Sequence, residues 1–254
     1  MKLESLLEVL HAAHHTWLVE SPWEERGGIL LVAPPGQLKT TLVYTLNSYA
    51  EACCTGDMNI ISMKSLRNMV LGGRYKTLAF GEMEKLYARN PNTAANIESH
   101  LKQFVEEGLR HFSHEDSATP IMPARCFVVA GITPSAYGRM YTAWEESGFS
   151  RRFLRIQYVL KDEKQILDAI HKWEKILFDL PVYWNGNRAM LKYNLDEKES
   201  KWILGLMKEQ PNSTPSVLIK RVAVVLKYKR PKDWRVIFKD VEASFGKQGA
   251  LLEL

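Results

Sequence analysis

Lys39 and Thr40 begin a helical pattern directly after a strand pattern, and together they could hold a phosphate group. The apolar run of residues 28–32 is rich in branched side chains, which predicts a buried strand. Two prolines and Gly36 then form a turn. A lysine ammonium attracts phosphate oxygens, and backbone N–H groups at a helix start bind anions. We therefore expect residues 33–41 to bind a polyphosphate, with the Thr40 hydroxyl on Mg²⁺.

The expected binding loop departs from the usual pattern, which has glycine at both ends. Here Ala33 and Leu38 occupy those places. Because Leu38 carries a side chain where the backbone passes closest to phosphate, the loop needs a backbone conformation that leucine tolerates. The alternative is an ordinary strand–turn–helix with one solvent-exposed lysine. The predicted nucleotide-binding residues are Ala33, Pro34, Pro35, Gly36, Gln37, Leu38, Lys39, Thr40 and Thr41.

A second strand pattern, residues 78–80, has acidic residues just beyond its end. Gly81 follows the strand, then Glu82 and, two residues later, Glu84. Ligands bind at the carboxyl ends of the strands in parallel α/β sheets. The Glu82 carboxylate could therefore orient or deprotonate a water molecule and contact Mg²⁺ through water. Alternatively, both acids are exposed residues at a helix start that interact favourably with its dipole.

Thr133 follows a third strand pattern, residues 126–131, and directly precedes Pro134. A hydroxyl at a strand end could position water beside a phosphate. The alternative is that Thr133 caps the helix that Pro134 begins, and both roles are compatible.

Arg151 and Arg152 stand just before a fourth strand pattern, residues 156–160. A planar guanidinium is suited to neutralising charge on a transferred phosphoryl group. The alternatives are a basic surface patch, or arginines paired with Glu145 and Glu146.

The order of these elements across residues 28–160 resembles the P-loop NTPases of the AAA+ or RecA-like type, near the replicative helicase ATPases of phages and mobile elements. The resemblance implies an α/β fold, with a mainly parallel sheet flanked by helices and an α-helical region after it. It implies that Glu82 directs the attacking water and that Thr133, in the sensor 1 place, detects the γ-phosphate. It also implies that Arg152, with Arg151 as the runner-up, is an arginine finger in a neighbour's site.

The resemblance implies two functions that differ in turnover. The first is an ATP- and Mg²⁺-dependent ring motor on nucleic acid, preferably DNA: a helicase or helicase-like ATPase in DNA replication. A finger acting in trans requires a homo-oligomer, such as a hexameric ring. The second is a nucleotide-dependent switch or helicase-loader-like assembly factor with weak hydrolysis, which Leu38 and Gly81 favour because Gly81 takes the place of the Walker B aspartate. A third reading, a small-molecule kinase, would place the arginines over their own active site.

The composition is that of a soluble globular protein, with 46% hydrophobic and 25% charged residues in 254. A net charge of +5 is a mild indication of a nucleic-acid partner. The three cysteines lack metal-ligand spacing, and His11, His14 and His15 are expected on a polar helix face. With no signal peptide and no membrane-spanning run in sight, we expect a cytoplasmic protein with reduced thiols and no membrane association.

The chain is expected to have three parts: an N-terminal helix in residues 1–26, the P-loop core in residues 27–160, and a helical lid or small basic helical module in residues 161–254. The last part combines lysines and arginines with Tyr228 and Trp234. Such a surface can track a nucleic-acid backbone and stack bases. Equally, it is a solvated face with Trp234 in a core.

Overall fold

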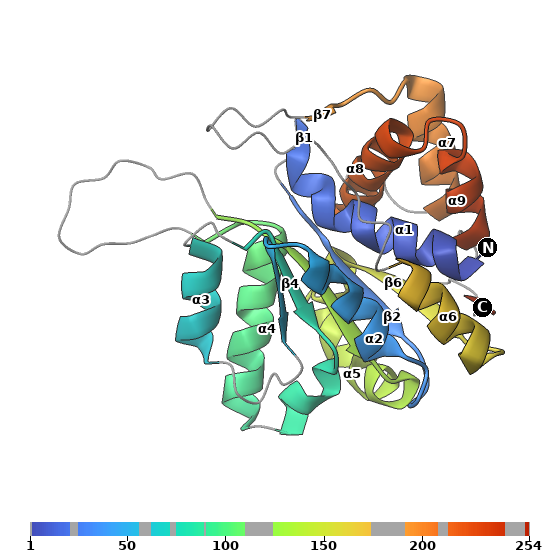
Figure 1. Cartoon of the computed structure of the whole chain (residues 1–254). Coiled ribbons are helices and arrows are strands. Elements are labelled where there is room, and N and C mark those ends of the chain that lie inside the picture. The colour runs from blue at the N-terminus through green and yellow to red at the C-terminus, as the bar shows by residue number, and fades with distance from the viewer. Residues whose placement is uncertain are drawn as a thin grey trace, which may run out of the picture.

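A parallel β-sheet forms the centre of the computed structural model, with strand order β3-β4-β5-β2-β6-β8 (Figure 1). The model describes residues 2–20, 25–55, 62–71, 75–88, 90–109, 124–173, 191–207, 213–241 and 252–253. All pairings in this sheet between the described strands are parallel, which confirms the predicted α/β class. The strands are β2 (Gly28–Val32), β3 (Ala52–Thr55), β4 (Thr77–Phe80), β5 (Phe127–Ile132), β6 (Phe153–Val159) and β8 (Leu252–Glu253).

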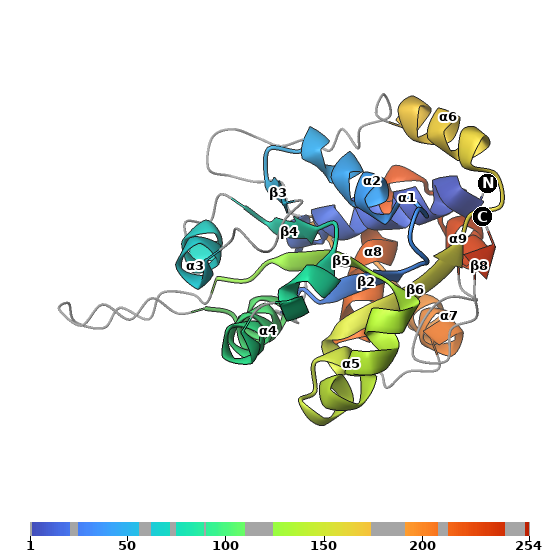
Figure 2. The same ribbon diagram turned by 90° about the horizontal axis from the view of Figure 1, so that it is seen from below.

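Helices cover both faces of the sheet, with α1 and α2 on one face and α4 and α5 on the other (Figure 2). A separate two-stranded sheet pairs β1 (Val19–Glu20) with β7 (Leu191–Lys192). The α-helices are α1 (Lys2–His14), α2 (Lys39–Tyr44), α3 (Met63–Leu71), α4 (Pro91–Val105), α5 (Pro134–Glu146), α6 (Glu163–Trp173), α7 (Glu197–Met207), α8 (Thr214–Lys229) and α9 (Trp234–Val241). The 3₁₀-helices are η1 (His15–Leu18), η2 (Thr45–Ser48), η3 (Met83–Ala88) and η4 (Ser150–Arg152).

The central strand β2 is buried on both faces, because its side chains alternate between two hydrophobic clusters. Ile29 and Leu31 join the cluster that contains side chains of α1, α2 and α8. Leu30 and Val32 join the cluster that contains side chains of α4 and α5. An uninterrupted apolar run is what a strand covered on both faces requires. This double burial fixes the carboxyl end of β2, where the loop of residues 33–38 begins.

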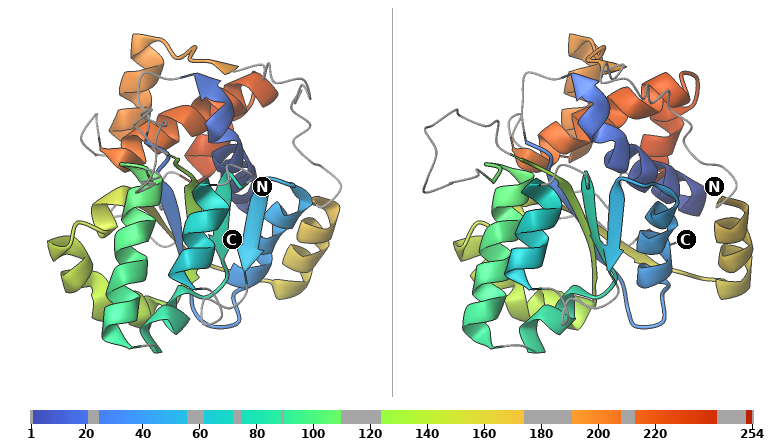
Figure 3. Two further views of the ribbon diagram at one scale, coloured as in Figure 1. Left: turned by 90° about the vertical axis from the view of Figure 1, so that its left-hand side faces the viewer. Right: turned by 60° about the vertical axis from the view of Figure 1, so that its left-hand side comes forward.

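The N-terminal helix and the C-terminal helices share one hydrophobic cluster with the sheet. Leu10 of α1, Ile29 of β2 and Val222 of α8 all belong to it. Figures 1 and 3 show α7, α8 and α9 beside α1, at the end of the molecule away from the β2–α2 loop. The three-part division of the chain stays a prediction, but this position of α7 to α9 argues against a lid over the loop.

One strand lies earlier than the sequence pattern indicates. By itself the sequence pattern predicts a helix over residues 41–52 and a strand over residues 58–62, of which 58–61 lie outside the described residues. Instead, α2 ends at Tyr44, η2 follows, and Ala52–Thr55 pairs with β4 as strand β3. Pairing with a neighbouring strand outweighs local propensity here.

Candidate phosphate-binding site

The β2–α2 loop holds Lys39 at the carboxyl end of the central strand. The Lys39 side chain is buried, with the residue 7% exposed. Its Nζ donates hydrogen bonds to the carbonyl oxygens of Ala33, at 2.9 Å, and Pro34, at 2.8 Å. The Ala33 N–H in turn donates to the Ile132 carbonyl of β5, at 3.2 Å. The ammonium is therefore not the solvent-exposed lysine of the alternative interpretation, but a desolvated charge held by its own loop.

Leu38 adopts a conformation that favours glycine. Its φ of 52° and ψ of 22° lie in the left-handed region, and among the described non-glycine residues it is alone in having a positive φ. This region costs a residue with a side chain about 1 kcal/mol. The Leu38 side chain packs against the hydrophobic cluster around α1, which offsets the cost. The loop thus keeps the backbone shape of the glycine pattern with leucine in it.

Gln37 fastens the loop to the end of β6. Its carbonyl oxygen accepts a hydrogen bond from the Tyr158 hydroxyl at 2.8 Å, and its Oε1 accepts one from the Leu160 N–H at 2.6 Å. Because the C=O and N–H of a trans peptide point in opposite directions, the bond from Tyr158 turns the Leu38 N–H away from β6. The sequence places Gln37 in the loop, but nothing in it indicates these two partners.

Thr40, Gly81 and Gly131 come into close contact beside Lys39. The Thr40 hydroxyl donates to the Gly81 carbonyl oxygen at 3.5 Å. A Cβ atom added to Gly81 would lie 2.8 Å from Thr40 Cγ2, and one added to Gly131 would lie 2.4 Å from the Gly81 carbonyl oxygen. The ends of β4 and β5 therefore close on the first turn of α2. An aspartate at position 81 would fit only if Thr40 moved.

The two carboxylates after β4 have different surroundings. Glu82 forms an ion pair with Lys85, with 2.9 Å between Oε2 and Nζ, and both side chains are 42% exposed. The Oε2 atom of Glu84 is buried and accepts no hydrogen bond within the described part of the chain. Burial lowers the pKa of Lys39, whereas the negative charge of Glu84 and then that of Glu82 raise it. Of the two, Glu84 thus interacts more strongly with the lysine.

Thr133 caps α5 at the end of β5. Its hydroxyl accepts a hydrogen bond from the Ala136 N–H at 3.4 Å and lies 3.5 Å from the Ser135 hydroxyl. The capping role is thereby confirmed. The carbonyl oxygen of Ile132, the residue before Thr133, accepts the hydrogen bond from the Ala33 N–H of the loop. Thr133 therefore directly follows a residue that contacts the loop. Its role as a sensor stays a prediction.

Arg151 and Arg152 lie at the opposite edge of the sheet from the loop. Strands β2 and β6 are parallel, and Gly28, the first residue of β2, pairs with Phe153, which follows Arg152. The loop begins only after Val32, and β2 spans about 13 Å at about 3.3 Å per residue. This separation argues against the kinase alternative, in which the arginines cover the loop of their own chain.

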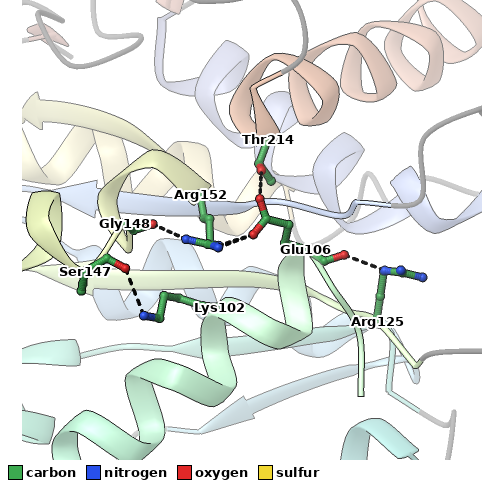
Figure 4. Close-up of polar contacts among 7 residues, drawn as sticks. All are labelled: Lys102, Glu106, Arg125, Ser147, Gly148, Arg152 and Thr214. Carbon is green, nitrogen blue, oxygen red and sulfur yellow. Dashed lines mark hydrogen bonds and ion pairs between the residues drawn. The ribbon is translucent and has the colours of Figure 1, made fainter. Parts of the chain in front are cut away.

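Arg152, which is buried, belongs to a polar cluster centred on the partly buried Glu106 (Figure 4). The Arg152 Nε donates to Glu106 Oε2 at 2.5 Å, and Nη2 of the same guanidinium contacts the same oxygen. Its Nη1 donates to the Gly148 carbonyl oxygen at 2.5 Å. Thr214 Oγ1 donates to Glu106 Oε1 at 3.3 Å, and Arg125 Nε donates to the Glu106 carbonyl at 2.7 Å. Glu106 thus joins the end of α4, the turn before β6 and the first turn of α8.

The partner of Arg152 is therefore neither Glu145 nor Glu146, the two carboxylates suggested by the sequence. Glu145 instead accepts a hydrogen bond from the Ser150 hydroxyl. Arg151, next to Arg152, is exposed. A guanidinium already held by a carboxylate and a carbonyl is less free to serve a neighbouring subunit than an exposed one, so the geometry favours Arg151 over Arg152 as a finger.

We predict that Glu106→Ala lowers the free energy of unfolding by about 3 kcal/mol, because it leaves the buried Arg152 guanidinium without its carboxylate. Urea denaturation measures this. Lys201→Ala is the matched control: it breaks an ion pair whose side chains are 73% and 81% exposed, and should change stability by less than about 0.5 kcal/mol. Equal effects of the two substitutions would contradict the structural role of Glu106.

The histidines of α1 and of the start of η1 are buried, so the predicted polar helix face is wrong. His11 bonds through Nδ1 to the Tyr49 hydroxyl at 2.7 Å and through Nε2 to Thr45 Oγ1 at 2.9 Å. His14 Nδ1 bonds to Thr77 Oγ1 at 2.8 Å, and His15 Nδ1 bonds to the His11 carbonyl at 2.9 Å. The rings of His14 and His15 also pack against the ring of Tyr49, so these histidines face the sheet side of the molecule. Among the described residues, no group of three or more His, Cys, Asp or Glu could hold a metal ion.

Part of the predicted basic surface in the C-terminal region is buried. Trp234 is 4% exposed and packs edge-to-face against Trp202 at a ring separation of 5.5 Å, so the core interpretation of Trp234 is the right one. Lys220 and Arg221 are also buried, whereas Tyr228 is 51% exposed. Base stacking by Trp234 is thus inconsistent with its packing.

Comparison with known proteins identifies no family for this chain, so its function is inferred from the geometry of the site. No model of a known protein family matches the chain, and no curated protein matches it. No helix in the described ranges is both long enough and apolar enough to cross a membrane.

Proposed function

We propose that the chain binds ATP through residues 33–41 and hydrolyses it as a ring-type motor on nucleic acid, with DNA as the expected partner. The observation that best supports this is the buried Lys39 ammonium, held by loop carbonyls at the carboxyl end of the central strand. Parallel α/β sheets bind ligands at that edge. Backbone donors of the loop begin at Gly36, because Pro34 and Pro35 have no N–H.

Mg²⁺ fits the donor atoms around the loop. The Thr40 hydroxyl, the Gly81 carbonyl and the carboxylates of Glu82 and Glu84 are all oxygen donors, which this ion prefers. Thr40 would hold the ion directly and Glu82 through water. When bound, Mg²⁺ would supply neutralisation of negative charge on the phosphate oxygens. The resemblance to P-loop NTPases implies two further roles: Glu82 directs the attacking water, and Thr133 detects the γ-phosphate.

The arginine finger in this proposal is Arg151, with Arg152 positioning it through the Glu106 cluster. Since both arginines lie at the edge of the sheet away from their own loop, a finger must act on a neighbouring subunit. The proposal therefore includes a homo-oligomer, such as a hexameric ring.

A second candidate function, a nucleotide-dependent switch or helicase-loader-like factor with weak hydrolysis, is favoured by one observation. Because of the contact between Thr40 and Gly81, an aspartate at position 81, the usual acidic ligand, would require Thr40 to move. Tight nucleotide binding with no turnover, with or without DNA, would support the switch.

The proposed motor is tested by ATP turnover with and without single-stranded DNA, together with complementation between variants. Turnover should rise with DNA, and both Lys39→Ala and Arg151→Ala should abolish it. A mixture of the two variants should regain activity, because an intact loop then meets an intact finger from a neighbour. Arg139→Ala, which alters an exposed arginine of α5, is the control and should leave turnover unchanged. A monomer with full activity would contradict the proposal.

A further inference from the structure

A carboxylate would fit at the position that follows β4 only if Thr40 moved. A Cβ atom at Gly81 would approach three atoms of Thr40, at 2.8, 3.0 and 3.2 Å. Gly131 lies against the backbone of Gly81, because a Cβ added to it would lie 2.4 Å from the Gly81 carbonyl oxygen. A carboxylate that serves the phosphate site must therefore come from further along the chain, from η3 or the turn before it.

The Glu82 carboxylate is exposed to solvent and forms an ion pair with Lys85. Its Oε2 lies 2.9 Å from the Lys85 ammonium, three residues further along, and its side chain is 42% exposed. An exposed ion pair of this kind contributes little to stability and leaves the carboxylate hydrated. Such a group is poorly placed to act on a water molecule held against a phosphate.

Glu84 has the properties that Glu82 lacks. Its Oε2 is buried and accepts no hydrogen bond from any described residue. An unpaired buried oxygen on an acidic group is costly, so such atoms commonly mark a place where a ligand or water belongs. The negative charge of Glu84 also raises the pKa of Lys39 more than that of Glu82 does. Glu84 stands in η3, three residues after Gly81, and Gly81 contacts Thr40 next to Lys39.

We propose that Glu84, rather than Glu82, is the catalytic carboxylate of this site and accepts a hydrogen bond from the attacking water. This inference rests on the proposed ATP hydrolysis. The water oxygen forms a bond to the γ-phosphorus, and the bond from that phosphorus to the β–γ bridging oxygen breaks. The bridging oxygen leaves with the electron pair as part of ADP. Glu84 accepts the proton that water loses and later releases it to solvent.

The test compares two substitutions that each remove one negative charge and keep the side-chain shape. We expect Glu84→Gln to lower kcat at least about 100-fold, the usual contribution of a general base. Affinity for ATP, measured with a fluorescent analogue, should stay within about twofold, because the base acts on water and not on the nucleotide. Glu82→Gln, which alters only a water-mediated contact to Mg²⁺, should lower kcat by less than about tenfold. The control Glu197→Gln, which removes one negative charge from an exposed ion pair, should leave both kcat and affinity within about threefold of the native protein.

The outcomes separate this inference from the proposed function. Turnover that survives Glu84→Gln, or a large fall in kcat with Glu82→Gln alone, overturns the assignment of Glu84 and leaves ATP hydrolysis intact. The complete absence of turnover in the native protein, with single-stranded DNA present, overturns both. Loss of affinity in Glu84→Gln equal to the loss of turnover would show a binding role and would also overturn the assignment.

Discussion

Replacing Lys39 by alanine should weaken ATP binding at least about 100-fold, equivalent to about 3 kcal/mol. The Lys39 ammonium is buried, so its attraction for phosphate oxygens is less screened than that of a surface lysine. Burial already lowers its pKa, and an anionic ligand would compensate that desolvation. A titration with a fluorescent ATP analogue measures the loss.

Two further variants separate charge from packing and from general electrostatics. Lys39→Met keeps the buried apolar stem and removes the charge, so it should bind ATP as weakly as Lys39→Ala. Lys85→Ala removes an exposed lysine from the same end of the sheet and should change affinity by less than about threefold. Native-like affinity in Lys39→Met would mean that this lysine does not hold phosphate, and the motor and switch proposals would both fail.

The parts of the site that sequence could predict are those set by local pattern. The apolar run before residue 33 specifies a strand covered on both faces, and the structure has β2 there with both faces buried. Thr133 before Pro134 specifies a helix cap, and the hydroxyl does cap α5. Each of these outcomes depends on neighbours within a few residues, which is the range over which a sequence pattern is informative.

The remaining features depend on contacts between distant segments. Arg152 finds Glu106, 46 residues earlier, instead of the acids beside it. In the sequence, Gly81 takes the place where the family pattern has an aspartate. In the structure, Thr40 lies so close to Gly81 that a larger residue there would require Thr40 to move. Neither fact is encoded in spacing, because the first follows from how α4, the turn before β6 and α8 meet, and the second from how β4, β5 and α2 converge. The same holds for His14, which is buried because its ring stacks on Tyr49 and bonds to Thr77, 63 residues later.

Lowering the pH from neutral to about 5 should unfold the protein or bring it close to unfolding, because three buried histidines must remain neutral in the folded chain. Burial lowers the pKa of His11 to about 3 and that of His15 to about 4, and it lowers the pKa of His14 well below the usual 6.5. Mutual repulsion within the cluster, and that of Lys229 for His15, acts in the same direction.

The sign follows from comparing the two states. The unfolded chain takes up protons on these histidines below pH of about 6.5, whereas the folded chain does not, so stability is lost as the pH falls. At pH of about 5 each histidine costs about 2 kcal/mol, and three cost about 6 kcal/mol, against a typical total of about 5–15 kcal/mol. Glu8 of the same helix acts with the opposite sign, because burial raises its pKa, but it is one group against three.

The slope of unfolding free energy against pH is the sharpest measurement of this effect, because a cavity left by a substitution shifts stability equally at every pH. Between pH of about 6 and 5 the free energy of unfolding of the native protein should fall by about 4 kcal/mol per pH unit. This slope corresponds to the uptake of about three protons on unfolding. His14→Asn keeps a polar atom near Thr77 and should reduce the slope by about one third. His171→Asn, at an exposed position of α6, should not change it. A flat profile in the native protein, or an unchanged slope in His14→Asn, would show that these histidines are charged or accessible in the folded chain.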